Sequence, residues 1–494
     1  MNRAHPAPKD MDAMMKTGLE IKALLRNLAI AEENWSAAVA LATLYGEFLN
    51  KNLLDDFGDL DFQKNISSKV PKVPLNRQLT GPVHYITEAL ETGGHTPLFK
   101  AVVNAHSKFG WQPVVVARRD SPALDSLHGS GISVYIIEEF EELLSCQVLG
   151  DLYLYSNPSD IEACIFADRV SKTGASIAFV NHADHAFGFQ PTCEIHFIEV
   201  SGLGRSITSK YRQASSQSFL GIPIDMSDGH STWSPSQGKF FLTIARREKL
   251  RPRDGADYPD FVNKITKKYK IPLVIFGQTG AEPWWGNYQE NEYLDFRGFK
   301  KLDDILPLAS TCTAYMDSFP LTGGTVLAMV GSVGAPIFSV KSMAYGYNAT
   351  ETTRKISIPD LEGCLDDFLV DGNLHYSLSE MSESVMNSHS QQEFEKRLLR
   401  INLGEITDFP DWANTSDILI SDVRNDFFSS LRFPFEISAN IQLANRLAIL
   451  TKVMRKLPYL NDVSFRSVAM SVLGQTGLMH REISRIQGLL RKLL

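Results

Sequence analysis

One glycine-rich segment has the residue types that a phosphate-binding turn needs. The residues from Asp317 to Thr325 follow a predicted strand, end in Gly323-Gly324-Thr325 and open a predicted helix. Glycines let a ligand approach the backbone closely, and a helix N-terminus directs unpaired N–H groups toward an anion. The segment therefore predicts a phosphate-binding turn, for which a plain tight turn is the alternative.

A cationic cluster follows another predicted strand, over residues 240–245. Arg246 and Lys249 stand directly after it, at the edge where ligands bind in open α/β sheets. Guanidinium and ammonium groups suit a diphosphate and can neutralise the charge that develops when a diphosphate leaves. A solvated charge run at the start of a helix is the alternative.

Two histidines and an aspartate crowd the end of the predicted strand 176–180. His182, Asp184 and His185 could act together, with one group removing a proton and a neighbour orienting it. We favour His185, and after it Asp184, as the group that deprotonates or positions an acceptor. The set is incomplete as a metal site because no further His or Cys ligand is near in sequence. A structural strand cap is the alternative.

A second glycine pair follows the predicted strand 83–87 and leads into a predicted helix over 98–105. It consists of Gly93 and Gly94 and is followed by His95. Carboxyl ends of parallel strands meet at one edge of a sheet, so this loop is expected to face the same cleft as His185. A plain strand-to-helix turn is the alternative.

The elements that must position these residues follow an α/β pattern. Short apolar runs alternate with longer amphipathic stretches, which predicts β-α-β units and largely parallel sheets. There are two such sets, so the body is predicted to be two α/β domains in tandem. The predicted strands are 83–87, 113–117, 133–137, 151–155, 176–180 and 194–200 in the first set, and 240–245, 272–277, 294–298, 312–317 and 336–340 in the second.

Helical patterns precede and follow the two α/β domains. Residues 18–50 predict a helical hairpin with Asn34 or Ser36 as a cap, and 53–79 resemble a linker. Helical periodicity returns after Ser377, with 427–460 and 463–494 as the longest segments. The basic C-terminal tail could contact an anionic membrane, a partner or a second copy, although a solvated helix face is the simpler interpretation. The predicted regions are 1–79 (helical), 80–228 (first α/β domain), 235–375 (second α/β domain) and 376–494 (helical), with a linker at 226–239.

Composition narrows the class of protein. The 494 residues include 49 Lys and Arg against 57 Asp and Glu, a formal net charge of −8, which disfavours nucleic acid as a ligand. No apolar run reaches the roughly 20 residues that cross a bilayer, and the N-terminus does not resemble a secretory signal, so a cytoplasmic location is expected. The five scattered cysteines predict buried thiols and neither a disulfide framework nor a zinc site.

Taken together, these segments resemble a bacterial glycosyltransferase of the GT-B type. The resemblance covers roughly residues 80–365 and rests on the glycine loop at 93–94, the Arg246/Lys249 cluster, the 182–188 segment and the turn at 323–325. It implies two tandem Rossmann-like domains with helical additions. It also implies transfer of a sugar, hexosyltransferase-like, from a nucleotide diphosphate sugar to a glycan or protein acceptor between the domains.

The resemblance assigns roles residue by residue. A UDP-sugar is the favoured donor, and no metal or other cofactor is expected. At the position where this fold commonly has an acidic ribose contact the chain has Met329, which leaves the donor nucleotide open. A sugar-nucleotide epimerase of the same fold and a non-catalytic partner protein are the alternatives. The implied donor-binding residues are Arg246, Lys249, Gly277, Gly298, Phe299, Phe319, Gly323, Gly324 and Thr325, and Gly93, Gly94 and His95 lie on the acceptor side.

Overall fold

The computed structural model divides into two compact units. The first unit comprises residues up to 197 and 207–216, and the second comprises 198–206 and 217–413. The structure describes residues 8–51, 57–90, 94–184, 187–224, 232–234, 239–252, 257–300, 302–319, 322–341, 346–355 and 357–413.

Three helices begin the first unit. The predicted hairpin is confirmed as α1 (Pro8–Ala31) and α2 (Trp35–Lys51), and Asn34 caps α2 by accepting the Ala37 N–H at 3.0 Å. The prediction of a linker over 53–79 is wrong, because α3 (Leu60–Lys69) lies within it. Asp59 caps α3, which buries Phe62 and Ile66 one helical turn apart. Burial of two apolar side chains on one face stabilises a helix whose overall sequence is polar.

The first unit contains a parallel sheet with strands at the predicted places. β2 (Val83–Ile86), β3 (Val114–Ala117), β4 (Ser133–Ile136), β6 (Asp151–Tyr155) and β7 (Ser176–Asn181) pair in parallel. With β8 (His196–Glu199) and β9 (Ser216–Phe219), the order is β4-β3-β2-β6-β7-β8-β9. The sequence pattern missed β1 (Arg77–Thr80), β5 (Cys146–Leu149) and β9, because these strands are short and mix polar with apolar residues. β1 and β5 form a separate two-stranded sheet.

Helices cover both faces of this sheet. One buried cluster joins Val83, Tyr85 and Leu152 of the strands to α2, α3, α6 (Phe140–Leu144) and α7 (Ile161–Ser171). On the other face α4 (His95–Lys108) brings His106 to His84 of β2, with 2.9 Å between Nδ1 and Nε2. The first unit also contains α5 (Asp125–Gly129) and the C-terminal part of α8 (Gly202–Tyr211), from residue 207 onward. The helical N-terminal region thus shares one core with the first sheet.

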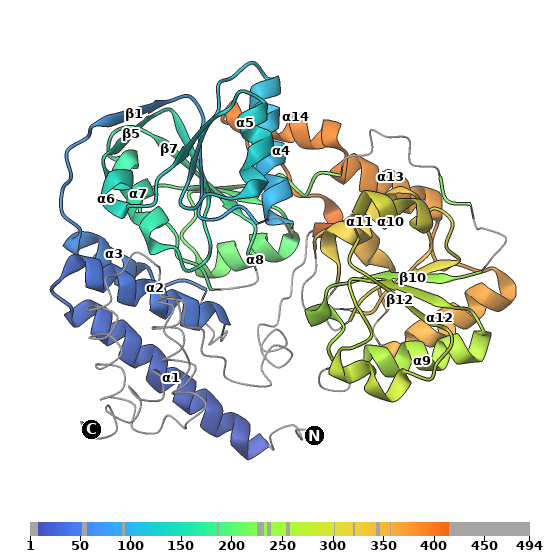
Figure 1. The fold of residues 1–494 in the computed structure, drawn as a ribbon. Coiled ribbons are helices and arrows are strands. Elements are labelled where there is room, and N and C mark those ends of the chain that lie inside the picture. Colours follow the sequence, from blue (N-terminus) through green and yellow to red (C-terminus); the bar gives the residue numbers. More distant parts are fainter. Residues whose placement is uncertain are drawn as a thin grey trace. The chain divides into compact units, whose positions relative to one another are not determined.

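The second unit contains a five-stranded parallel sheet, and all five strands lie where the sequence predicts them. Its order is β12-β11-β10-β13-β14. Figure 1 shows α9 (Tyr258–Tyr269) and α12 (Ile358–Asp371) on one face, and α10 (Leu302–Ala309) and α11 (Gly324–Ser332) on the other. The strands are β10 (Phe241–Ile244), β11 (Leu273–Phe276), β12 (Leu294–Gly298), β13 (Ala314–Met316) and β14 (Ile337–Phe338).

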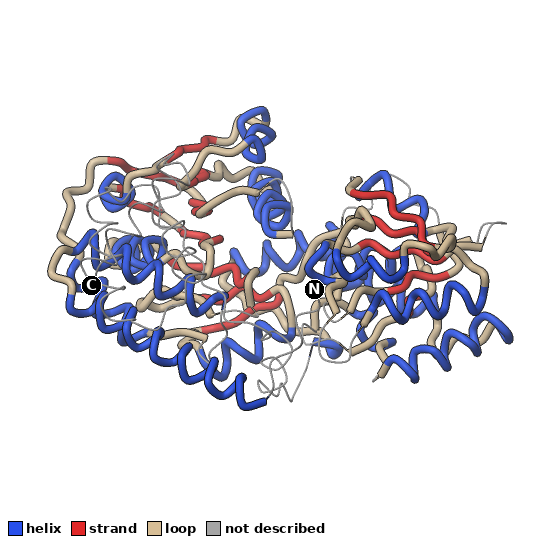
Figure 2. The backbone as a smooth tube through the Cα atoms, turned by 60° about the horizontal axis from the view of Figure 1, so that its bottom comes forward, coloured by secondary structure: helices blue, strands red, loops and turns tan. Residues whose placement is uncertain are grey.

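Alternation of side chains explains this layering. Phe241, Leu273 and Ile275 join the cluster under α9 and α12, and Leu242 and Val274 join the cluster under α10 and α11. Successive residues of a strand point to opposite faces, so apolar residues at every position require helices on both sides. Figure 2 shows the strands of each unit flanked by helices.

Helices α13 (Leu378–His389) and α14 (Gln391–Asn402) confirm the predicted helical return after Ser377. The predicted segments 427–460 and 463–494 lie outside the described residues, as does most of the predicted linker 226–239. Of the cysteines, Cys146, Cys164 and Cys312 are buried, but Cys193 and Cys364 are only half-buried, so the prediction of five buried thiols is wrong for those two. Among the described helices, none has a stretch long and apolar enough to span a membrane.

Candidate functional site

The parallel sheet of the second unit collects the predicted donor-binding residues at one edge. Arg246, Gly277, Gly298 and Asp317 follow or end the strands β10, β11, β12 and β13 in turn. Because these strands are parallel, the loops that follow them leave the sheet at the same edge. The sequence therefore placed these residues together without any knowledge of tertiary contacts.

The turn between β13 and α11 is closed by one buried carboxylate. Oδ1 of Asp317 accepts the N–H of Ser318 at 2.8 Å and the N–H of Gly323 at 3.3 Å. Oδ2 accepts the hydroxyl of Thr322 at 2.7 Å. Thr322 and Gly323 are buried, whereas Gly324 and Thr325 at the start of α11 are partly exposed. The turn thus presents the first residues of a helix, and α11 has no side-chain cap.

Two cations converge on Thr322. The Lys249 ammonium donates to the Thr322 carbonyl at 2.7 Å, and Nη2 of Arg354 donates to the Thr322 hydroxyl, also at 2.7 Å. A side chain added at Gly323 would place its Cβ 3.9 Å from the Lys249 ammonium. Lys249 is thus beside the glycine turn, as predicted, and one of its three donors is used to hold the turn.

A second loop, residues 346–354, is hydrogen-bonded to this turn. Nη1 of Arg354 contacts Glu351 at 3.2 Å, with side chains only 3% and 8% exposed. Glu351 accepts the N–H groups of Gly346 and Tyr347, the latter at 2.9 Å. The Asn348 amide donates to the Gly324 carbonyl at 3.1 Å. The loop 346–354 is therefore fixed to the turn by hydrogen bonds at both Thr322 and Gly324.

Burial shifts the pKa values of the charged groups in this network. Desolvation raises the pKa of Asp317 above its ordinary value, although the charges of Arg354 and Lys249 oppose that shift. Desolvation also raises the pKa of Glu351, against the opposing charge of Arg354. The pKa of Lys249 is lowered by desolvation and by Arg246, and the charge of Asp317 opposes this. The charges of two cations and two carboxylates thus compensate one another in this site. Such compensation is required because a buried charge without a partner is costly in free energy.

The remaining predicted donor-binding residues differ in how far their side chains are exposed to solvent. Arg246 is exposed, and Phe299 is 71% exposed beside Gly298, which has a φ of 64°. A Cβ at Gly277 would lie 2.4 Å from the Ala245 carbonyl oxygen, so glycine is required for the ends of β10 and β11 to approach. Phe319 is 2% exposed, and its ring packs on Tyr258 and Phe261 in the core. The ring of Phe319, which the resemblance placed among the donor-binding residues, therefore lies in the core and not at the surface.

Met329 occupies the position where the resemblance leads one to expect an acidic ribose contact. It is 9% exposed and belongs to a buried cluster with Leu306, Ala349 and Val385. A carboxylate in such surroundings would lose its hydration without a partner. The methionine at this position is therefore explained by packing of α11 against its neighbours.

In the first unit the structure brings two of the predicted histidines together. The rings of His95, which begins α4, and His182, which follows β7, stack with centroids 3.8 Å apart and planes 9° apart. Burial lowers the pKa of His95 to about 4, and a hydrogen bond to the Tyr155 backbone opposes this shift. His95 is therefore neutral at physiological pH. Its Nε2 is buried without a hydrogen-bond partner among the described residues.

A neutral imidazole has one N–H and one lone pair. The hydrogen bond to the Tyr155 backbone uses the N–H of His95, which leaves the lone pair on Nε2. The hydroxyls of Tyr155 and Ser156, at the end of β6, are also buried without a partner in the described part of the chain. Buried polar atoms without partners cost free energy and often mark functional sites.

The other predicted acceptor-side residues are less informative. The Asp184 side chain is completely buried, and Gly94 precedes α4 as its N-cap residue. Gly93 and His185 lie outside the described residues. Among the residues that the structure describes, no group of three or more His, Cys, Asp or Glu could hold a metal ion.

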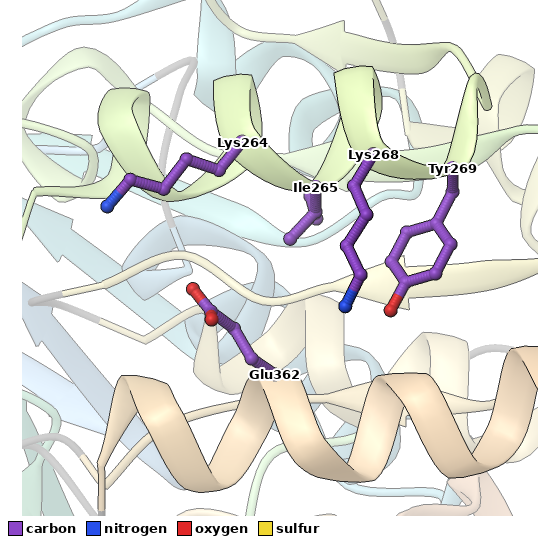
Figure 3. Close-up of a pocket in the computed structure, with 5 residues that line it drawn as sticks. All are labelled: Lys264, Ile265, Lys268, Tyr269 and Glu362. Carbon is purple, nitrogen blue, oxygen red and sulfur yellow. The ribbon is translucent and has the colours of Figure 1, made fainter.

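A small groove in the second unit does not contain any of the predicted site residues (Figure 3). It lies between α9 and α12 and is lined by Lys264, Ile265, Lys268, Tyr269 and Glu362. Lys264 already contacts Asp260 at 2.7 Å, and Lys268 contacts Asp366 at 2.5 Å. Each of the two lysines is thus paired with a carboxylate at the surface.

Sequence reasoning missed the residues that hold the turn. Thr322 and Arg354 are 32 positions apart, and no local pattern marks Arg354. Asp317 did carry a signal, because a carboxylate directly after a strand and ahead of a glycine pair can accept the turn's N–H groups. Tyr155 and Ser156 were missed because they end a strand that otherwise has the composition of a core.

No model of a known protein family matches the sequence, and no curated protein matches it. Among solved structures, a glycosyltransferase from Rickettsia africae is similar with a TM-score of 0.50 and 12% identity, covering 65% of this chain and 98% of that one. HepE of Anabaena, solved with UDP and glucose, has a TM-score of 0.47 and 13% identity, covering 66% and 99%. An O-GlcNAc transferase of Thermobaculum terrenum has a TM-score of 0.41 and 13% identity, covering 96% and 78%.

At such low identity a structural likeness establishes the fold. The likeness to the Rickettsia africae structure agrees with the two parallel sheets flanked by helices. The chain thus has the GT-B fold of tandem Rossmann-like domains, with additional helices, as the sequence predicted.

Proposed function

We propose that this protein is a glycosyltransferase that moves a sugar from a nucleotide diphosphate sugar to a hydroxyl or amide of a glycan or protein. The observation that carries the proposal is the Lys249 ammonium beside the turn that opens α11, at the carboxyl edge of the second sheet. Cations and helix N-termini are the groups that stabilise a leaving diphosphate. The GT-B fold supports the same conclusion.

On the donor side, Arg246 and Lys249 bind the diphosphate together with the turn of Gly323, Gly324 and Thr325. Arg246 is exposed at the end of β10 and carries the fork of donors that binds phosphate oxygens in pairs. The exposed ring of Phe299 offers a stacking surface for the base. A UDP-sugar is the first donor to test, and side-chain cations replace a metal in charge neutralisation.

On the acceptor side, His95 and His182 contact the attacking group, with His185 and Asp184 close in sequence. The Nε2 lone pair of His95 can accept a proton from a hydroxyl as the new glycosidic bond forms. The proton passes to His95, and the sugar–phosphate bond breaks with its electron pair going to the diphosphate.

The test is a panel of UDP-, GDP- and dTDP-sugars with the purified full-length chain, in which binding and donor hydrolysis are measured. We expect one donor class to bind and to be hydrolysed slowly in the absence of acceptor, without loss on adding EDTA. Changing Arg246 and Lys249 together to Ala should lower kcat/KM for the donor by about 100-fold or more.

A matched control separates this effect from a general loss of positive charge. The double substitution Lys264→Ala and Lys268→Ala removes two cations of the same unit that lie in the groove between α9 and α12, and it should leave donor turnover unchanged. Absence of donor binding by the wild-type chain would refute the proposal. Isomerised donor without acceptor would indicate an epimerase, and tight binding without turnover in cell extract would indicate a non-catalytic protein.

A further inference from the structure

The hydroxyl of Thr322 has a fixed role between two charged groups. Arg354 can only donate, so its Nη2 occupies an acceptor position of the hydroxyl at 2.7 Å. The hydroxyl proton is then directed to Oδ2 of Asp317, also at 2.7 Å. Asp317 in turn accepts the Gly323 N–H. The chain of hydrogen bonds thus runs in one direction from Arg354 through Thr322 to Asp317.

The same arginine is fixed from its other side. Nη1 of Arg354 contacts Glu351, which accepts two N–H groups of the loop 346–347. The planar guanidinium presents Nη1 and Nη2 to two acceptors in a fixed geometry, whereas a lysine ammonium is a compact charge without such a fork. Arg354 therefore ties the loop 346–354 to the turn 322–325.

The glycine turn has little structure of its own to hold it. Gly323 and Gly324 have no side chains, α11 has no side-chain cap, and the Gly323 N–H is used by Asp317. The N–H groups of Gly324 and Thr325, which are partly exposed, belong to the first turn of α11 and have no acceptor within the helix. Their direction depends on where Thr322 is held. If the contacts that hold Thr322 are lost, the turn gains conformational freedom. Ordering the turn again when a ligand binds then lowers the affinity.

We propose that Arg354 is a positioning residue for the diphosphate turn and acts through the hydroxyl of Thr322. This inference rests on the proposed function and adds to it a residue that contacts no ligand. Arg354 and Thr322 orient the Gly324 and Thr325 N–H groups toward the phosphates, whereas Arg246 and Lys249 supply charge. The effect is accordingly confined to the phosphate part of the donor and spares the base.

The test compares binding of UDP and of uridine by isothermal titration calorimetry of the full-length chain. Thr322→Val removes the hydroxyl at nearly constant shape, Thr322→Ser keeps it, and Arg354→Lys keeps the charge but loses the fork. We expect Thr322→Val and Arg354→Lys to weaken UDP binding about 10-fold or more and uridine binding less than 2-fold. Thr322→Ser should bind UDP within about 3-fold of wild type, and donor KM should rise more than kcat falls.

Lys268→Met is the matched control, because it removes a cation of the same unit that pairs with Asp366 on the surface. It should bind UDP as the wild type does. If Thr322→Val binds UDP like the wild type, or loses UDP and uridine equally, the positioning role is refuted while the proposed function stands. If the wild type binds no nucleotide diphosphate, both fail. Should Arg354→Lys not fold, the Thr322→Val and Thr322→Ser pair still decides.

Discussion

Each unit has a strand-turn-helix connection at its candidate site. The side chains that surround this connection are charged in the second unit and neutral in the first. The turn from β13 to α11 is held by four charged groups of balancing sign: the buried side chains of Asp317, Glu351 and Arg354 and the partly buried Lys249. At the start of α4, which follows β2, the groups are instead neutral: His95 stacks on His182, and the nearby hydroxyl of Tyr155 has no partner among the described residues.

The proposed function offers a physical reason for this difference. A diphosphate brings charge, so its turn must keep a fixed geometry, and buried ion pairs with hydrogen bonds are stiff because moving one partner exposes the other's unpaired charge. A hydroxyl acceptor is neutral, and it needs a lone pair to receive its proton. A histidine kept neutral by burial offers that lone pair across the physiological pH range.

The largest expected effect is on the charged turn. Asp317→Asn keeps the shape but leaves Lys249 without its counter-charge and Arg354 with Glu351 alone, which should lower the free energy of unfolding by about 3 kcal/mol. UDP affinity should fall by at least 10-fold. The measurements are chemical denaturation and calorimetry. Asp366→Asn, which breaks a surface pair with Lys268, should cost less than about 1 kcal/mol. Equal costs for the two variants would contradict the contrast between the turns.

The next effect concerns the neutral turn. His95→Asn removes the Nε2 lone pair and should lower kcat for transfer about 100-fold, as expected for loss of a proton acceptor. UDP affinity should change less than 2-fold, since the donor turn belongs to the other unit. Steady-state kinetics and calorimetry measure the two effects. His128→Asn, at an exposed histidine of the first unit, is the control and should leave both unchanged. A parallel loss of UDP binding by His95→Asn would show that the units do not divide the work.

The smallest effect is the pH dependence of stability that His95 contributes. Its pKa is about 4 in the folded protein and ordinary in the unfolded chain, so the unfolded state takes up the proton first as the pH falls below 6.5. Stability is therefore lost on acidification, by about 1–2 kcal/mol at pH 5 from this residue. His95→Asn should lose less stability between pH 7 and pH 5 than the wild type does. Identical acid sensitivity of the two chains would mean that His95 is not held neutral by burial.

Much of the fold could be predicted because the spacing of apolar residues and the composition of a segment are local properties of the sequence. Apolar runs such as 83–87 and 272–277 predicted β2 and β11, since a strand covered on both faces is apolar at every position. The helix α3 and the strands β5 and β9 were missed. Their residues are mixed in polarity, and contacts with the rest of the unit determine their structure.

For the site, the sequence was enough to predict the positions of the loops, whereas the contacts of the side chains could not be predicted from it. The order of strands along the chain was enough to place Arg246, Gly298 and the turn at 323–325 at one sheet edge, because all parallel strands end there. Spacing could not show that Lys249 holds Thr322, that Phe319 lies in the core, or that Met329 of α11 packs in a buried cluster. These depend on side-chain direction, which only the packed structure defines.

The sequence by itself determined the α/β class, the tandem arrangement of two sheets and the glycine turn ahead of α11. The tertiary structure alone decided that Arg354 reaches Thr322 and that His95 stacks on His182. Both pairs join residues far apart in the chain, and hydrogen bonds and ring contacts act only over a few ångströms. Such contacts exist only once folding has brought their elements together.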